Sequence, residues 1–266
     1  MTATVASAQV VEHSAPMAGA IELVLQHPDA AAAAAPGQFF QLAVEAPHAI
    51  LRRPYSVAWA DPASGRIGFI FNVVGAGSSW LASRRVGDGI DLLGPLGVGF
   101  TVDGGTRPAV CVAGGLGIAA FPALVVALVG RGRPVLLLHG ARASTQLLPP
   151  ARLKGAEVRQ ATDDGSAGLR GTVLDLLPSA GLADADLFAC GPTPMLGGLI
   201  DIARQLEVPL ARIQVALETP MGCGMGTCLG CVTPKHGGGY LLTCTEGPCI
   251  RADRIDWGRM VDAFHG

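Results

Sequence analysis

Residues 108–131 read PAVCVAGGLGIAAFPALVVALVGR, and this stretch decides the fold of the middle of the chain. A short apolar run ends in a group of glycines, and a longer apolar run follows it. That order indicates a buried strand, a tight turn and a buried helix. Apolar runs and helical patterns keep alternating through PVLLLHGA (134–141), AEVRQATDD (156–164), ADLFACGP (185–192) and TPMLGGLIDIARQL (193–206). The sequence therefore predicts a parallel α/β sheet over residues 105–213.

The same stretch has a second interpretation, because residues 110–130 contain no charge and are long enough to cross a bilayer. The glycines at 114, 115 and 117 and Pro122 favour the strand, turn and helix instead. A net charge of −2 gives no reason to expect nucleic acid or an anionic membrane as a partner. The first residues, MTATVASAQVVEHSAP, lack the basic start and apolar run of a signal peptide. We therefore expect a cytoplasmic protein without a membrane span.

Two further parts flank the α/β region. Short β-rich runs separated by turn residues occupy residues 1–104, namely GAIELVLQ (19–26), GQFFQLAV (37–44), YSVAWA (55–60), RIGFIFNVV (66–74) and DGIDLLG (88–94). They are typical of a small antiparallel barrel or sandwich, with a short helix expected at 78–85. Residues 214–266 are rich in glycine and cysteine and form the third part. The chain thus divides at about 104 and 213.

The glycines after the first apolar run match a nucleotide-binding pattern. Gly115, Gly117 and Ala120 fit G-x-G-x-x-A between a strand and a helix, where backbone N–H groups can approach a pyrophosphate. The acidic residue expected about 20 positions later is missing, so the pattern is not that of an ordinary Rossmann dehydrogenase. A tight turn without a ligand remains the alternative.

Another turn, Cys190-Gly191-Pro192, follows the apolar run ADLFA. It should lie at the carboxyl edge of a strand, where open parallel sheets bind ligands. A plain turn explains these residues equally well when they are considered alone.

Two loops of the N-terminal part suit an anionic, aromatic ligand. Arg53-Pro54-Tyr55-Ser56 combines a cation, a rigid turn, an aromatic ring and a hydroxyl, which suits a phosphate and a flat ring. Residues 75–78, GAGS, precede the expected short helix and offer a second anion site. Structural roles would explain either loop alone; their combination with the two turns above favours a ligand.

The cysteines give the most specific pattern. Of seven cysteines, five lie between Cys223 and Cys249, and without a secretory signal we expect them to stay reduced. The spacing Cys223-x4-Cys228-x2-Cys231, completed by Cys244, follows the plant-type [2Fe–2S] pattern. Glycines at 222, 224, 226 and 230 let the backbone wrap closely and direct N–H groups at sulfur.

Alternatives to this cluster remain open from the residues alone. A structural zinc site also uses four cysteines, but usually from two short C-x2–4-C pairs. The thiols could also bind nothing. Cys249 could replace Cys244 as the fourth ligand, although a small buried apolar role suits Cys249 better.

The order of these motifs resembles the ferredoxin-reductase-like electron-transfer subunits of class 1B dihydroorotate dehydrogenases, almost from end to end. The matching segments are PGQFFQL (36–42), LRRPYSV (51–57), GAGS (75–78), LLGPLGVGF (92–100), GGLGIAA (114–120), TDDGSAGLRGTVLDLL (162–177), FACGPTPML (188–196), LETPMGCGMGTCLGC (217–231) and CTEGP (244–248). The resemblance implies an FAD-binding barrel, a pyridine-nucleotide domain and a C-terminal [2Fe–2S] module.

The resemblance also implies which residues bind the cofactors. FAD contacts would be Arg53, Pro54, Tyr55, Ser56, Ile70, Phe71, Asn72, Gly77 and Ser78. Cluster ligands would be Cys223, Cys228, Cys231 and Cys244. The nicotinamide side would use Gly114, Gly115, Gly117, Cys190, Gly191 and Pro192, with Asp164 and Arg142 as further candidates.

Three positions depart from the family pattern. Ser78 replaces the usual threonine and keeps the hydroxyl, while Tyr55 occupies a variable position. Cys249 stands where a residue other than cysteine is more common, which leaves the ligand set slightly open.

The cofactors implied by the resemblance give the chemistry an order. A nicotinamide donates two electrons at once and a cluster accepts one, so flavin must lie between them. The resemblance implies electron transfer between NAD(H) and an FMN-containing catalytic subunit that oxidises dihydroorotate, in a heterotetramer. It also implies that this chain carries no acid–base residue for the pyrimidine. A related FAD/[2Fe–2S] reductase subunit with another partner, of the sulfide dehydrogenase or bifurcating ferredoxin–NADP type, is the alternative. A zinc-stabilised protein without redox activity is the third possibility.

Overall fold

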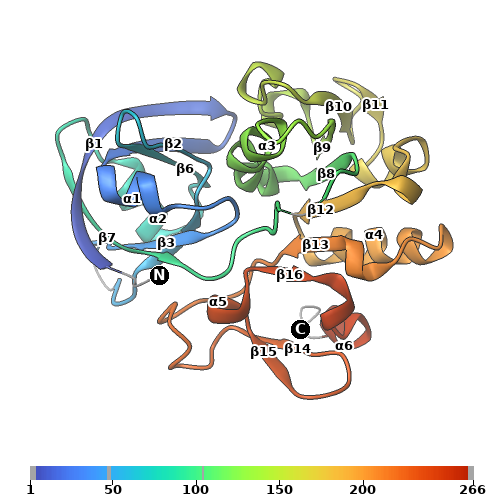
Figure 1. Ribbon diagram of the computed structural model, residues 1–266. Helices are drawn as coiled ribbons and strands as arrows, with labels where there is room; N and C mark the ends of the chain where they lie inside the picture. The colour runs from blue at the N-terminus through green and yellow to red at the C-terminus, as the bar shows by residue number, and fades with distance from the viewer. Residues whose placement is uncertain (1–3, 47–48, 104, 263–266) are drawn as a thin grey trace.

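The computed structural model describes residues 4–46, 49–103 and 105–262, and the chain folds into three connected parts (Figure 1). The first is an antiparallel sheet in the order β4-β3-β7-β1-β2-β6-β5. Its strands are β1 (Thr4–Met17), β2 (Ala20–Gln26), β3 (Phe39–Leu42), β4 (Arg53–Ser56), β5 (Trp59–Asp61), β6 (Arg66–Asn72) and β7 (Gly89–Leu96). Alternate side chains of these strands face the interior of the barrel, where Phe40, Phe69 and Phe71 belong to one core. This confirms the antiparallel architecture predicted for the N-terminal part.

Two short helices accompany this sheet, α1 (Pro28–Ala33) and α2 (Ala76–Ala82). The expected helix at 78–85 is therefore shifted toward the N-terminus. The hydroxyl of Ser78 accepts hydrogen bonds from the N–H groups of Val74 at 2.9 Å and Gly75 at 3.0 Å. These bonds cap a first turn that starts at Ala76, which explains the earlier start of the helix.

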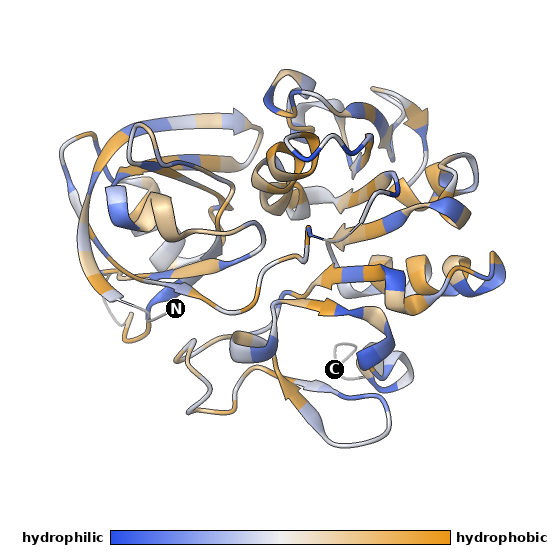
Figure 2. Cartoon of the chain, in the orientation of Figure 1, coloured by the Kyte–Doolittle hydropathy of each residue, from blue (hydrophilic) through white to orange (hydrophobic). Residues whose placement is uncertain are grey.

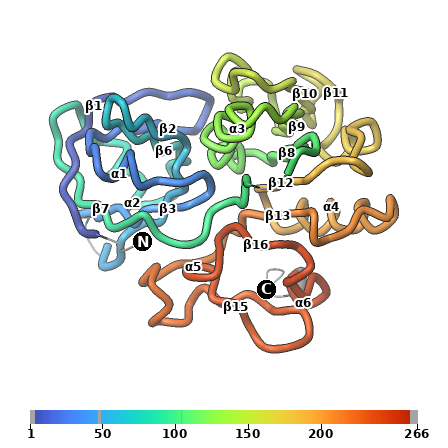
Figure 3. Tube along the Cα trace, in the orientation of Figure 1, coloured from blue at the N-terminus to red at the C-terminus, as the bar shows by residue number. Residues whose placement is uncertain are grey.

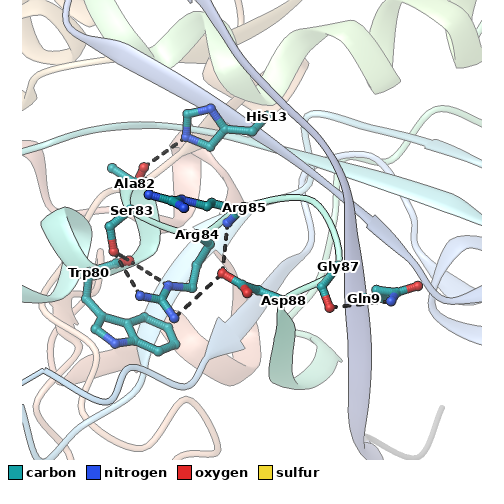
Figure 4. Close-up of polar contacts among 9 residues, drawn as sticks. All are labelled: Gln9, His13, Trp80, Ala82, Ser83, Arg84, Arg85, Gly87 and Asp88. Carbon is teal, nitrogen blue, oxygen red and sulfur yellow. Dashed lines mark hydrogen bonds and ion pairs between the residues drawn. The ribbon is translucent and has the colours of Figure 1, made fainter.

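A polar network holds the C-terminal end of α2 against β1 (Figure 4). Nε2 of His13 on β1 lies 2.9 Å from the carbonyl oxygen of Ala82. The Arg84 guanidinium lies 4.1 Å from the centre of the Trp80 ring and donates to the Trp80 carbonyl at 3.1 Å. Its other end approaches Asp88 at 3.8 Å. Because α2 is fixed at this end, its first turn keeps a defined position on the barrel.

The second part is a sheet in the order β11-β10-β9-β8-β12-β13-β16. Its strands are β8 (Ala109–Gly114), β9 (Val135–Ala141), β10 (Glu157–Thr162), β11 (Leu169–Arg170), β12 (Asp186–Cys190), β13 (Ile213–Ala216) and β16 (Cys249–Arg251). All neighbours pair in parallel except β13 and β16. The chain order reverses between β8 and β12, so their carboxyl ends, Gly114 and Cys190, form the crevice where such sheets bind ligands.

Residues 108–131 form the strand, turn and helix that the sequence predicts. Strand β8 is followed by a 3-10 turn over Gly115–Ala120, and α3 (Phe121–Val129) begins after it. Pro122 lies in the first turn of α3, where its missing N–H costs no hydrogen bond. Figure 2 shows α3 mostly in hydrophobic colours, and it packs in the core beside the sheet. Within the described residues, no helix combines the length and hydropathy needed to cross a membrane.

The third part adds strand β16 to the second sheet and lies at the bottom of the view in Figure 1. It contains the hairpin β14 (Val232–Pro234) and β15 (Tyr240–Leu242), with α5 (Thr243–Glu246) and α6 (Trp257–Asp262). In Figure 3 the trace leaves β13, forms the loop that bears the clustered cysteines, and returns as β16 beside β13. Helix α4 (Thr193–Gln205) and α6 then pack over one core with Leu241 and Val215. The segment between β13 and β16, which contains the cysteine loop (residues 221–231), is thus tied to the parallel sheet at both of its ends.

Hydrophobic cores cross the boundaries between the three parts. Met17 and Ala58 of the barrel pack in one core with Cys111 and Phe121 of the α/β part. On its other side, the barrel contributes Phe39 to a cluster with the cysteine loop. The parts therefore hold one another through buried apolar surface, and the domain division at 104 and 213 stays a prediction.

A buried carboxylate also joins the barrel to the α/β part. Glu22 on β2 is 1% exposed and accepts hydrogen bonds from Nε1 of Trp59 at 2.7 Å and from Ser14 at 3.2 Å. The guanidinium of Arg152, from the α/β part, forms an ion pair with the same carboxylate. A buried charge needs such partners, so this contact orients the two parts.

Replacing Arg152 should destabilise the chain, because the buried Glu22 carboxylate would lose its ion pair and keep only the neutral donors Trp59 and Ser14. We expect Arg152→Ala to lower the free energy of unfolding by about 1.5–3 kcal/mol, as for a lost hydrogen bond to a charged group. Denaturant titration followed by circular dichroism would measure the loss. The control Arg204→Ala removes an exposed pair with Asp201 and should cost less than about 1 kcal/mol. Equal effects of the two changes would contradict a special role for Arg152.

Candidate functional site

A cleft of about 690 Å³ opens between the barrel, the carboxyl edge of the parallel sheet and the segment that leads to the cysteine loop. Most of the candidate cofactor residues line it together, although they come from distant parts of the chain. They are Pro54, Tyr55, Ser56, Ile70, Phe71, Asn72, Gly114, Gly115, Gly117, Cys190, Gly191 and Pro192. Arg53, Gly77 and Ser78 lie beside the cleft rather than in its wall. The structure thus brings the barrel loop and both turns of the sheet to one place.

The barrel wall of the cleft is aromatic. The rings of Tyr55 on β4 and Phe71 on β6 are 4.8 Å apart, tilted by 39°. Burial raises the pKa of Tyr55 to about 12, against the opposing charge of Arg53. The phenol therefore stays protonated near neutral pH and can donate a hydrogen bond. This wall suits a flat, conjugated ring with polar edges.

Arg53 and Gly77 form a cationic corner next to this wall. A Cβ atom at position 77 would lie 2.7 Å from Nε of Arg53, so only glycine lets the guanidinium lie over the first turn of α2. Nη1 of Arg53 donates to the carbonyl oxygen of Leu51 at 2.5 Å, which orients the side chain. The Ser78 hydroxyl is buried and committed to its own loop, where it also donates to the Gly75 carbonyl at 3.0 Å. Any ligand contact at Ser78 would therefore use its backbone.

The opposite wall is the glycine turn after β8. Gly115 has a φ of +53°, which favours glycine, and a Cβ at Gly117 would overlap the Cys190 carbonyl. Beneath this turn His139 is fully buried, and its Nε2 lies 3.2 Å from the Gly115 carbonyl oxygen. Burial lowers the pKa of His139 to about 4, so the neutral ring donates from Nε2. The sequence pattern did not indicate that His139 supports the glycine turn, although the residue stands at the end of a predicted strand.

The two charged candidates of this wall differ in position. Arg142 lines the cleft as expected, but Asp164 does not. The exposed Asp164 carboxylate accepts from the N–H and hydroxyl of Ser166 at 2.9 and 2.6 Å and closes its own turn. Its neighbour Asp163 lines the cleft instead. Two adjacent acids at a strand end cannot be told apart by sequence pattern, because their orientation depends on the turn that follows.

The cysteine loop places its four candidate sulfurs in two pairs. Cys231 and Cys244 are buried together, and the backbone N–H of Cys244 donates to the Cys231 sulfur at 3.4 Å. Cys223 forms hydrogen bonds with the backbone and thiol of Cys228, which is exposed. Among the described residues, no three Cys, His, Asp or Glu side chains converge as ligands of one metal ion.

Backbone N–H groups are aimed at these sulfurs, as the glycine pattern predicted. Gly226 donates to Cys244 at 3.1 Å, and Met225 donates to Cys223 at 3.4 Å. Hydrogen bonds from Thr227 and the backbone lower the pKa of Cys223 to about 5. Burial and the neighbouring Cys231 raise the pKa of Cys244 to about 12. The donor set therefore suits a cationic metal centre, which would offset the repulsion between buried thiolates.

Cys249 lies apart from these pairs. It is buried on β16, where its thiol donates to the Gly37 carbonyl at 3.5 Å, and it packs in the core that contains Phe100. Burial raises the pKa of Cys249 well above its usual value. Its surroundings are those of a small buried hydrophobe.

The cleft and the buried cysteine pair share part of their walls. Phe39 of β3 lines the cleft and packs against Cys231 and Cys244 on its other side. Met221, at the start of the cysteine loop, also belongs to both. Sequence reasoning did not single out either residue. The cleft and the buried cysteine pair are therefore connected through shared side chains.

Two family models match the chain. Residues 3–100 match the oxidoreductase FAD-binding domain, and residues 218–256 match the iron–sulfur cluster binding domain of dihydroorotate dehydrogenase B. The electron transfer subunit of dihydroorotate dehydrogenase B (NAD(+)) from Geobacillus thermodenitrificans (strain NG80-2) is 37% identical over 227 residues, 83% of this chain and 86% of that protein. The subunit of the same name from Shouchella clausii (strain KSM-K16) is 36% identical over 241 residues, 88% and 91% of the two chains.

Solved structures show the same architecture. An NADH-dependent reduced ferredoxin–NADP oxidoreductase superposes with a TM-score of 0.85 and 27% identity, over 96% of this chain and 91% of that chain. The ferredoxin reductase in carbazole 1,9a-dioxygenase gives a TM-score of 0.71 at 26% identity, over 81% and 69% of the two chains.

These matches confirm the resemblance found in the sequence motifs. They agree with the aromatic cleft of the barrel and with the paired sulfurs of the C-terminal part, and they identify an oxidoreductase subunit with FAD and an iron–sulfur cluster as cofactors. The chain belongs to the family of electron transfer subunits of dihydroorotate dehydrogenase B (NAD(+)).

Proposed function

We propose that the chain carries electrons between NAD(H) and an FMN-containing dihydroorotate dehydrogenase subunit in pyrimidine biosynthesis, through FAD and a [2Fe–2S] cluster. One observation carries the proposal: Phe39 and Met221 line the cleft and also pack against Cys231 and Cys244. When bound, FAD takes two electrons from a nicotinamide and releases them singly to the cluster. The chain's own residues hold these groups close together and exclude water from the space between them.

FAD would bind along the barrel wall. Tyr55 and Phe71 offer aromatic surface for the ring system, and Arg53 beside Gly77 offers a fixed cation for phosphate. The full set of proposed FAD contacts is Arg53, Pro54, Tyr55, Ser56, Ile70, Phe71, Asn72, Gly77 and Ser78. Ser78 would take part through its backbone, since its hydroxyl caps α2.

The nicotinamide nucleotide would bind across the cleft at the edge of the parallel sheet. Gly114, Gly115 and Gly117 and the turn Cys190-Gly191-Pro192 provide close backbone approach there. Arg142 stays a candidate for this ligand, and Asp163 takes the place first given to Asp164. We propose NADH as the nucleotide, on the resemblance to NAD-linked family members.

The cluster would be held by Cys223, Cys228, Cys231 and Cys244. A [2Fe–2S] cluster would be held by four cysteine thiolates. The spacing Cys223-x4-Cys228-x2-Cys231, completed by Cys244, fits such a cluster, whereas a structural zinc ion usually takes its cysteines from two short C-x2–4-C pairs. The spacing therefore favours iron–sulfur over zinc.

The catalytic partner would dock where the cluster is most exposed. Cys228 is exposed, and a Cβ at Gly222 would lie 3.4 Å from its sulfur and 3.7 Å from Cδ1 of Leu51. Leu51, Met225 and Leu229 are all more than half exposed in this region. Apolar side chains around an electron exit suit a protein interface better than water. We propose that the FMN subunit covers this surface, within a heterotetramer.

A second function has one specific observation in its favour. The NADH-dependent reduced ferredoxin–NADP oxidoreductase covers nearly the whole chain with a TM-score of 0.85. The same cofactors could then serve another partner than the FMN subunit. Co-purification with the FMN subunit, and orotate formation by the complex, would decide for the first function. We also propose a cytoplasmic location, because clustered thiols stay reduced there.

Cys228 should be essential for the cluster. In Cys228→Ser a hydroxyl replaces a thiolate ligand, so we expect the visible absorbance and the EPR signal of the reduced [2Fe–2S] cluster to be lost or altered, with flavin absorbance retained. Cys249→Ala is the matched control, since its thiol lies in a separate core, and it should keep the cluster spectrum. An unchanged spectrum in Cys228→Ser would remove this cysteine from the ligand set.

Arg53 should be important for retention of FAD. We expect Arg53→Ala to weaken FAD binding about 10- to 100-fold, the loss of one hydrogen bond between charged groups. Flavin content per chain after gel filtration would show the change. The neighbouring Arg52 pairs with Asp91 at 3.0 Å instead, so Arg52→Ala should retain flavin. Full occupancy in Arg53→Ala would contradict a phosphate contact.

The docking proposal can be separated from cofactor binding. Leu229 is 59% exposed, and Leu229→Glu places a charge on the proposed interface. We expect it to reduce co-purification with the FMN subunit at least tenfold, because a buried unpaired charge costs several kcal/mol. NADH-dependent reduction of ferricyanide by the isolated chain should persist. Val86→Glu, on the barrel at 67% exposure, is the control and should leave the complex intact. An intact complex in Leu229→Glu would place the partner elsewhere.

A further inference from the structure

Strand β3 has one face toward the barrel core and the other toward the cysteine loop. Phe40 and Leu42 point inward and are fully buried among barrel side chains. Phe39 points the other way, against Cys231 and Cys244. Because side chains alternate along a strand, Gln41 shares the face of Phe39. A polar amide thus lies at a buried position directed toward the cysteines.

The Gln41 side chain is 0% exposed, and neither of its amide atoms has a hydrogen-bond partner within the described part of the chain. Buried amides in proteins are almost always paired, because an unpaired donor is costly. The nearby Gln38 illustrates the rule: it donates to the Gly97 carbonyl at 2.9 Å and accepts from Ala35 at 3.0 Å. The unpaired Gln41 amide therefore points to a ligand as its partner.

The position of the amide shows which part of the chain it faces. A Cβ atom built on Gly224 would lie 3.0 Å from Nε2 of Gln41, so the amide reaches the backbone between Cys223 and Met225. Gly224 has a φ of +73°, and its missing side chain leaves room for this approach. The acceptors expected here are the anionic sulfurs of the cysteine loop and of a bound cluster.

The strand that carries this amide is fixed in place. The backbone carbonyl of Gln41 accepts from Arg52 at 3.4 Å, and its backbone pairs with Pro54 of β4 and with Leu93 of β7. Strand β4 carries Tyr55 of the aromatic wall of the cleft. Gln41 thus connects the flavin wall to the cysteine loop through fixed backbone.

We propose that the Gln41 side-chain amide donates a hydrogen bond to a sulfur of the [2Fe–2S] cluster, either the Cys223 thiolate or a bridging sulfide, and thereby raises the reduction potential of the cluster. An N–H donor stabilises the reduced, more negative form more than the oxidised form. The inference deepens the proposed function and depends on the cluster proposed there. The residue acts on the potential and takes no part in ligation.

The test is an anaerobic redox titration of the cluster in the purified, flavin-loaded chain, followed by EPR. Gln41→Met keeps the length of the side chain and removes the donor, so the midpoint potential should become more negative at unchanged iron content. Gln9→Met is the same substitution at an exposed position of β1 and should leave the potential unchanged. A wild-type potential in Gln41→Met, with the cluster present, overturns the inference and leaves the proposed function intact.

A second measurement uses the unaltered sequence, in case Gln41→Met does not fold. With glutamine labelled by ¹⁵N in the side-chain amide, pulsed EPR of the reduced cluster should show a hyperfine coupling to that nitrogen. The absence of any glutamine coupling overturns the inference. A wild-type chain that binds no iron and sulfide, after anaerobic reconstitution, overturns both the inference and the proposed function.

Discussion

The packing of Phe39 between the cleft and the cysteine pair is the contact on which the rest of the site depends. A flavin can accept a hydride and release its electrons singly, so it couples a two-electron donor to a one-electron acceptor when it lies close to both. Phe39 lines the cleft and belongs to the same buried cluster as Cys231 and Cys244. The barrel and the cysteine loop therefore have to fold against each other before the site exists.

This closeness is maintained by buried contacts far from the cysteines. Glu22 on β2 accepts from Trp59 and from Arg152 of the α/β part, which orients the two parts across their common core. Strand β16 pairs with β13 and ties the C-terminal part to the parallel sheet. These contacts together position the parts that form the cleft.

Electrostatics differ between the two sides of the site. Two neutral groups with displaced pKa values belong to the walls of the cleft: Tyr55, which lines it, stays protonated, and His139, buried beneath the glycine turn, stays uncharged, each because of burial. The cysteine loop gathers four thiol groups, and backbone N–H groups of Met225 and Gly226 donate to two of them, Cys223 and Cys244. A neutral phenol donor in the cleft suits an organic cofactor, whereas clustered cysteine sulfurs suit iron.

Local patterns determined much of this protein from the sequence alone. The alternation of apolar runs indicated the antiparallel and parallel sheets, and the cysteine spacing indicated an iron–sulfur cluster, because such patterns reflect contacts between near neighbours in the chain. Glycines at 115 and 117 marked a turn of close approach for the same reason.

Only the tertiary structure decided which of several equivalent residues reach the site. Asp163 rather than Asp164 lines the cleft, Cys249 joins a separate core, and Gln41 faces the cysteine loop. These outcomes depend on the packing of segments that lie up to about two hundred residues apart. The direction of a side chain across such an interface is set by its strand's register and its neighbours, which no short stretch of sequence contains.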